Sequence, residues 1–131
     1  MSKRTMIRFL AGALLTSATA AQAHHGYAQY DRCKSVSLEG TVESVAWENP
    51  HVLVMLKAGD DVVYRIEWQT LGRLAQASVY RDAVKPGDRL VVTGSINKDP
   101  AVKIMTLLTD VRRPSDGWSW RDPRPRPSQC G

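Results

Sequence analysis

The chain has 131 residues, 43% of them hydrophobic, and a formal charge of +5. This length suffices for one compact domain and no more. Three of the 18 basic residues and none of the 13 acidic ones lie in the first 23 residues, so the other 108 carry a charge of only +2. A body this close to neutral has no general electrostatic footprint for nucleic acid.

The first 23 residues have the pattern of an export signal. Basic residues come first, an apolar run follows over residues 9–20, and Ala21-Gln22-Ala23 is an A-x-A cleavage signature. The apolar run is about a dozen residues long, whereas a membrane-spanning helix needs roughly 20. We therefore predict a signal peptide over residues 1–23, no transmembrane anchor after cleavage, and a periplasmic or secreted protein that begins at His24. Cleavage after Ala20 is the alternative.

The two cysteines, Cys33 and Cys130, lie near opposite ends of the mature chain. In an oxidising compartment such a pair predicts a disulfide. Closing a loop of about 100 residues contributes up to about 4–5 kcal/mol in the chain-entropy model. Metal binding by the two thiols is the weaker alternative, because they lack C-x-x-C spacing and an adjacent histidine.

From residue 36 onwards, the pattern predicts five strands and one short helix. Apolar residues alternate along the first strand and then slip by one position, which predicts a bulge near Glu43-Ser44. Thr70 is placed to cap the helix, and Pro86-Gly87 occupies the centre of an expected type II turn. The expected strands cover residues 36–47, 51–56, 62–69, 89–96 and 102–111, and the expected helix covers residues 70–80.

Three strands, a helix and two strands is the element order of the OB-fold. We therefore predict an all-β fold, a five-stranded OB-fold-like Greek-key barrel over residues 24–111. A generic β-sandwich is the alternative. Residues 112–131 are rich in proline, arginine and tryptophan. They predict an extended tail that a disulfide through Cys130 straps back onto the barrel.

All three histidines occur at two places, His24-His25 at the expected mature N-terminus and His51 after Asn49-Pro50. An N-terminal histidine can bind Cu(II) through its amino and ring nitrogens together. A second histidine opposite it completes a three-nitrogen site, called a histidine brace, which suits tetragonal Cu(II). The metal-free alternative is a solvated His24-His25 end and a His51 ring that donates to a carbonyl in its turn.

Trp118 and Trp120 form a second candidate site, because both point the same way in an extended tail. Arginines flank them, and an aromatic pair with arginines can stack on sugars, bases or peptide prolines. The alternative is that the two rings only pin the tail onto the barrel.

The sequence is poor in catalytic motifs. It has no G-x-S-x-G, H-E-x-x-H, P-loop or dinucleotide fingerprint. We therefore predict a protein that is not an enzyme, with a copper-dependent oxidase of brace type as a minor alternative.

Four motifs together resemble a family of small exported bacterial proteins, the Domain of Unknown Function 6152 family. They are His24-His25-Gly26, Leu38-Glu39-Gly40-Thr41-Val42, Trp47-Glu48-Asn49-Pro50-His51 and Lys85-Pro86-Gly87-Asp88. The resemblance covers residues 24–111 and leaves the C-terminal tail outside. It implies an exported, barrel-like protein without an established activity, and it places both histidine clusters within family motifs.

The sequence thus predicts an exported binding protein that binds or sequesters copper through His24, His25 and His51. The alternative is a metal-free OB-like module that binds an oligosaccharide, a peptide or an envelope protein partner.

Overall fold

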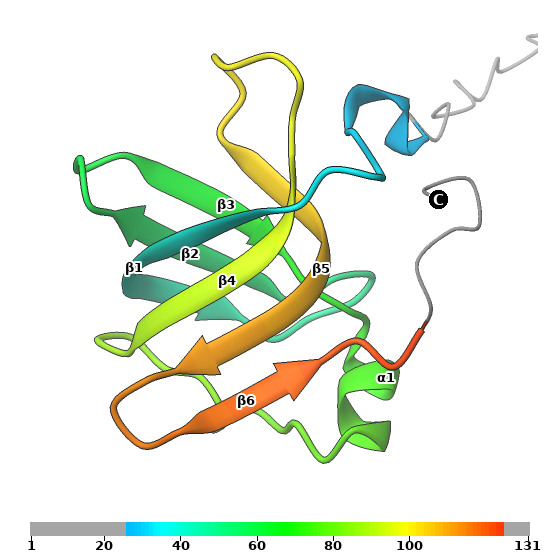
Figure 1. Ribbon diagram of the computed structural model, residues 1–131. Coiled ribbons are helices and arrows are strands. Elements are labelled where there is room, and N and C mark those ends of the chain that lie inside the picture. The colour runs from blue at the N-terminus through cyan, green and yellow to red at the C-terminus, as the bar shows by residue number, and fades with distance from the viewer. Residues whose placement is uncertain (1–25, 125–131) are drawn as a thin grey trace, which may run out of the picture.

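The computed structural model describes residues 26–124, and Figure 1 shows their arrangement. His24, His25 and Cys130 lie outside the described residues. The elements in chain order are η1 (Tyr27–Gln29), β1 (Val36–Ala46), β2 (Leu53–Ala58), β3 (Val63–Glu67), α1 (Leu71–Gln76), β4 (Arg89–Ile96), β5 (Ile104–Arg113) and β6 (Trp118–Arg121).

The strands form one sheet in the order β3-β2-β1-β4-β5-β6. The sheet closes on itself because β3 also pairs with β5 in parallel, with Arg65 opposite Ile104 and Ile66 opposite Met105. Strands β1 to β5 therefore make a closed barrel (Figure 1). The predicted five-stranded barrel is confirmed, and the sandwich alternative is wrong.

β1 pairs with both β2 and β4, and it has a bulge near Glu43-Ser44, as predicted. Its C-terminal half pairs with β2, its N-terminal half pairs with β4, and the register shifts between Val42 and Ser44. Gly40 lies where the two pairings meet, and a Cβ there would collide with the carbonyl oxygen of Lys57. The bulge lets one strand turn the corner that barrel closure requires.

α1 is shorter than the 70–80 helix that the sequence predicts. Thr70 caps it by accepting a hydrogen bond from the Arg73 N–H, as expected. Past Gln76, Ser78 adopts a φ of 58°, and the N–H of Val79 donates to the Leu74 carbonyl. This Schellman closure ends the helix early and buries Leu74 and Val79 in the barrel core. Among residues 26–124, no helix is long and apolar enough to span a membrane.

The C-terminal part differs from the expected extended tail. β5 continues to Arg113, and β6 pairs with it antiparallel, from Asp110 opposite Arg121 to Arg113 opposite Trp118. A turn with Gly117 at a φ of 75° joins the two strands. The predicted start of the tail at residue 112 therefore falls inside a strand, because the barrel edge at β5 offers backbone partners to the residues that follow.

Candidate functional site

The segment Trp47-Glu48-Asn49-Pro50-His51 contacts the residues that connect β3 to α1. The rings of Trp47 and Trp68 pack with their centroids 6.3 Å apart. The Asn49 side chain accepts a hydrogen bond from the Leu71 N–H at 3.1 Å, at the first turn of α1. His51 Nδ1 lies 2.9 Å from the Trp68 carbonyl oxygen. The most distinctive motif of the sequence is therefore a clamp that joins the β1–β2 loop to residues 68–71.

The partner of His51 determines which ring nitrogen is free for a ligand. A carbonyl oxygen can only accept a hydrogen bond, so Nδ1 must carry the proton in this contact. In the neutral ring, Nε2 then keeps its lone pair, which is the state that a metal ligand needs. The ring is partly buried and its orientation is held. The carbonyl contact matches the metal-free interpretation of His51, and it leaves Nε2 of the neutral ring without a proton.

Four tryptophans form a cluster beside this clamp. Trp68 contacts Trp120 at 5.4 Å and Trp118 at 6.4 Å between ring centroids, both edge to face. Trp68 Nε1 is buried and has no hydrogen-bond partner among the described residues. Edge-to-face packing brings N–H groups against aromatic faces, which accept them weakly.

Trp118 and Trp120 are therefore part of the packing of β6 on the barrel. Trp120 is 5% exposed, which leaves little of its ring for a ligand, and Trp118 is half-buried. The guanidinium of Arg113 lies over the Trp118 ring at 5.3 Å and bonds to Asp88 and Asp116. These contacts favour the pinning interpretation over ligand stacking.

A chain of polar contacts leads from the clamp to the residues that follow β6. Gln69, next to Trp68, donates from Nε2 to Asp122 Oδ2 at 3.4 Å, and Asp122 pairs with Arg124 at 2.6 Å. Burial acts to raise the pKa of Asp122, but hydrogen bonds from the side chain and backbone of Arg124 outweigh it and lower that pKa. The pKa of Arg124 is raised, first by its hydrogen bond to Asp122, with Tyr27 among the weaker causes.

Three of the other predicted site residues, His24, His25 and Cys130, fall outside the described part of the chain. The three-histidine site and the Cys33–Cys130 disulfide therefore stay predictions. Cys33 precedes β1, and its N–H donates to Asp31 Oδ1 at 3.1 Å. Within residues 26–124, no group of three or more His, Cys, Asp or Glu side chains is placed to hold a metal ion.

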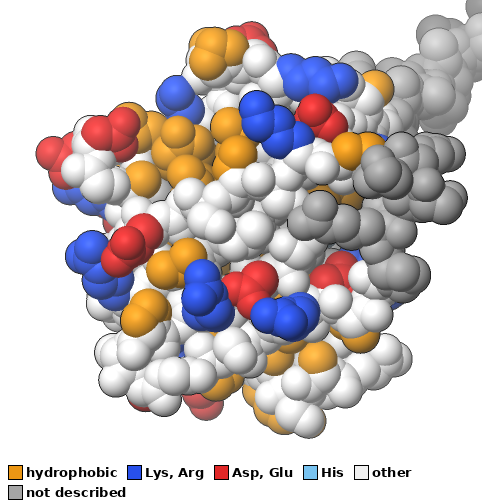
Figure 2. All heavy atoms as spheres, viewed as in Figure 1, with side chains coloured by type: hydrophobic (Ala, Val, Ile, Leu, Met, Phe, Trp, Pro, Cys, Tyr) orange, Lys and Arg blue, Asp and Glu red, His pale blue; other side chains and the backbone are white. Residues whose placement is uncertain are grey.

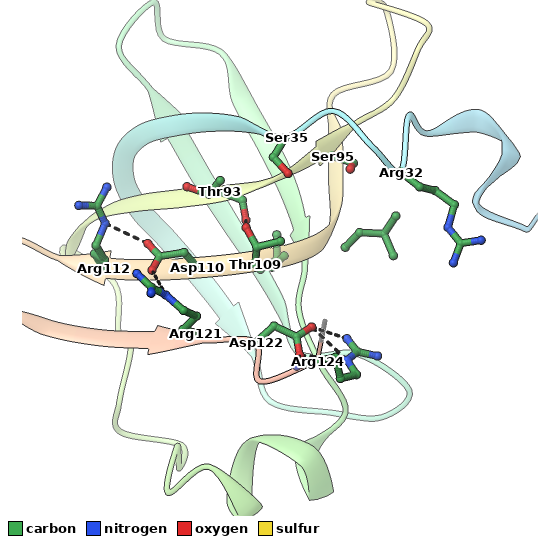
Figure 3. A pocket seen from close by; sticks show the side chains of 12 residues that line it. Arg32, Ser35, Thr93, Ser95, Thr109, Asp110, Arg112, Arg121, Asp122 and Arg124 are labelled. Atoms are coloured by element: carbon green, nitrogen blue, oxygen red, sulfur yellow. Dashed lines mark hydrogen bonds and ion pairs between the residues drawn. The ribbon is translucent and has the colours of Figure 1, made fainter. Parts of the chain in front are cut away.

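The structure also shows a groove that the sequence did not reveal. Its volume is about 680 Å³, and it opens beside β4, β5 and the end of β6 (Figure 3). Its charged lining consists of Arg32, Asp110, Arg112, Arg121, Asp122 and Arg124. Figure 2 shows basic and acidic side chains next to one another on this face. The only signal in the sequence was the local excess of arginine after residue 111.

One comparison with known proteins gives a match. Residues 12–105 match the model of a protein family described as "Family of unknown function (DUF6152)". Curated proteins and solved structures give no match. The matched residues include both histidine clusters and the whole clamp, and they end at the start of β5. Because the match covers well over half of the chain, the protein belongs to the DUF6152 family.

Proposed function

We propose that the protein is an exported copper-binding protein that holds Cu(II) between its mature N-terminus and His51. The observation that carries the proposal is the 2.9 Å contact between His51 Nδ1 and the Trp68 carbonyl. That contact leaves Nε2 as the ligand atom and fixes its direction. A ring held in this way gives a metal site one rigid nitrogen, and the amino and ring nitrogens of His24 would supply the others.

The path of the chain supports a meeting of the two histidine clusters. Tyr27 is three residues from His24, and three residues of fully extended chain reach about 10 Å. Arg124 is linked through Asp122 to Gln69, the neighbour of Trp68, and it lines the same groove as Arg32, which lies over the Tyr27 ring. Figure 1 draws η1, the β1–β2 loop and the end of β6 on the same, right-hand side of the view.

The chemistry of the donor set selects copper. Removal of residues 1–23 would give His24 a free α-amino group beside its imidazole, a two-point chelate that an internal histidine lacks. Together with His51 Nε2, these atoms make three nitrogens, and tetragonal nitrogen sites favour Cu(II) over Zn(II). The proposed role is to bind, sequester or deliver the ion in the periplasm.

The proposal requires export and correct processing, and intact mass tests both. Protein purified from the periplasm should have the mass of residues 24–131 less two hydrogens, as cleavage after Ala23 and a Cys33–Cys130 disulfide require. A mature chain that begins at Ala21 would remove the N-terminal chelate. Two thiols that react with an alkylating reagent under non-reducing conditions would contradict the disulfide.

Copper titration of the same preparation tests the site. We expect one Cu(II) per chain and an electron paramagnetic resonance spectrum with nitrogen hyperfine structure. His51→Ala should remove one nitrogen from that spectrum. The control is Asn49→Ala, which changes the same clamp without removing a ligand and should keep the spectrum. Identical spectra for the wild type and His51→Ala would contradict the proposal.

A further inference from the structure

The groove owes its shape to an irregularity in the pairing of β4 with β5. Thr93 faces Asp110 and Ser95 faces Thr106, so residues 107–109 bulge opposite Gly94. Leu107 adopts a φ of 52°, a left-handed conformation that is strained for a bulky residue. A Cβ on Gly94 would lie 2.8 Å from the Thr106 carbonyl oxygen. This side of the hollow is therefore part of the barrel wall, whereas Arg32 and Arg124 line it from the segments before β1 and after β6.

One side of the groove carries more positive than negative charge. Asp110 is the carboxylate between two arginines, with Arg112 Nε at 2.9 Å and Arg121 Nε at 3.7 Å. The Arg112 and Arg121 side chains are 56% and 83% exposed, whereas Asp110 is 16% exposed. A single carboxylate neutralises one of the two guanidinium groups. The other has its charge available to an anion in the groove.

The opposite side also carries an unbalanced cation. Arg124 pairs with Asp122, but Arg32 has no carboxylate within ion-pair distance among the described residues, and its guanidinium lies 5.7 Å from the Tyr27 ring centre. Figure 3 shows Arg112 and Arg121 at one end of the groove and Arg32 at the other. Four arginines and two aspartates give the lining a formal charge of +2. Charge of one sign in a concave site attracts the opposite sign more strongly than it would on a flat surface.

Hydroxyl groups lie between the two ends. Ser35, Thr93 and Thr109 line the middle of the groove (Figure 3). The Thr93 hydroxyl bonds to that of Ser37 at 2.8 Å, whereas the Ser35 hydroxyl has no hydrogen bond among the described residues. Hydroxyls and carboxylates can exchange hydrogen bonds with the hydroxyls of a ligand. The volume of about 680 Å³ is within the roughly 300–1,000 Å³ of small-molecule sites.

We propose that this groove binds a hydroxylated organic anion, a sugar acid or a sugar phosphate. Guanidinium groups recognise the carboxylate or phosphate oxygens through paired N–H donors. The hydroxyls and the two aspartates bond the sugar hydroxyls. None of the three histidines is among the described residues that line the groove, so substitutions can test the groove and the copper site separately.

Calorimetric titration of the mature, copper-free protein at low ionic strength tests the proposal. The probes are glucuronate, glucose 6-phosphate, inorganic phosphate and glucose. We expect both sugar anions to bind and glucose to bind at least about tenfold more weakly, because charged hydrogen bonds dominate the recognition. Raising the salt concentration should weaken the binding. The stronger of glucuronate and glucose 6-phosphate identifies whether a carboxylate or a phosphate is preferred.

Three variants locate the binding. Arg32→Gln and Arg121→Gln should each weaken the binding of both sugar anions about fivefold or more. Arg81→Gln, which removes an exposed arginine that does not line the groove, should leave it unchanged. Ser35→Ala should weaken the sugar anions and leave inorganic phosphate unchanged. Circular dichroism melts of each variant show that the fold is intact.

The proposal is overturned if neither sugar anion binds, if glucose binds as well as they do, or if Arg81→Gln loses as much affinity as Arg121→Gln. His51→Ala should leave anion binding unchanged, so a failure of the copper site and a failure of the groove are separate results.

Discussion

His51 Nδ1 lies 2.9 Å from the carbonyl oxygen of Trp68, 17 residues further along the chain. Two residues earlier, Asn49 bonds the Leu71 N–H in the same clamp. Both side chains satisfy backbone groups where β3 gives way to α1. The β1–β2 loop is therefore joined to residues 68–71 by two hydrogen bonds. The same contacts orient the His51 ring and leave its Nε2 for a ligand.

The clamp makes a measurable contribution to stability. His51→Ala should lower the free energy of unfolding by about 1 kcal/mol through the lost hydrogen bond. Asn49→Ala should lower it by about 0.5–2 kcal/mol, since its amide oxygen acts as a cap on α1. Urea denaturation of the copper-free proteins measures both values. If neither variant is less stable than the wild type, the clamp is not a stabilising structure.

Gly40 should tolerate no side chain. A methyl group there would press on the backbone of β2 at Lys57, so Gly40→Ala should destabilise the barrel by about 1–3 kcal/mol. The matched control is Gly59→Ala, because a Cβ on Gly59 meets nothing within 4 Å. Thermal melts should separate the two variants clearly. Equal melting temperatures would show that β1 can move away from β2 at little cost.

The two tryptophans of β6 should differ in their effect on stability. Trp120 is 5% exposed, and truncation to alanine should cost about 3–5 kcal/mol. Trp118→Ala should cost less, because that ring is half-buried. Denaturant titrations of both variants test the order. Copper affinity should be unchanged in Trp118→Ala, and a large loss would link the tail to the metal site.

Acid should remove part of the stability through Asp122 and Asp116. Burial opposes the ionisation of Asp122, but Arg124 outweighs it and holds the pKa low, and Arg113 does the same for Asp116. A carboxyl group with a lowered folded pKa contributes stability above its unfolded value of about 3.9. That contribution is lost as the pH falls through the folded pKa.

The free energy of unfolding should therefore fall as the pH is lowered below about 4. Asp122→Asn should make this fall less steep. Asp82→Asn, which changes an exposed aspartate with no ion pair among the described residues, is the control. Denaturant melts between pH 3 and pH 6 give the comparison. Equal slopes for Asp122→Asn and the wild type would show that the ion pair with Arg124 does not form in solution.

Local patterns in the sequence were sufficient for most of the barrel. The slip in alternation at Glu43-Ser44 marks a bulge because side chains of a strand change faces with each residue. Thr70 and Gly87 act within one turn of the chain, and both are found as expected, with Gly87 at a φ of 91°. The ring contact of His51 with a carbonyl was one of the two interpretations of that residue.

β6 and the groove depend on contacts that local patterns do not contain. The four residues of β6 stand among prolines, and they become a strand only because β5 offers a free edge. Arg32 and Arg121 are distant in sequence, and they line the same groove only in the folded barrel. The hollow itself follows from a register shift between β4 and β5, which no periodicity in either strand indicates.

In the proposed copper site, the α-amino group of His24 is a ligand together with His51. The amine must lose its proton to bind, so Cu(II) affinity should rise with pH up to about 8. The direct measurement compares the natural N-terminus with one that is extended by three residues. A shorter extension would place a histidine third from the amino terminus, which itself creates a copper-binding arrangement.

We predict that the extension weakens Cu(II) binding by more than about tenfold and removes its rise with pH, because the amine leaves chelating distance of the His24 ring. Equal affinities and equal pH profiles for the two proteins would contradict the account, and a metal-free binding module would then describe the protein better.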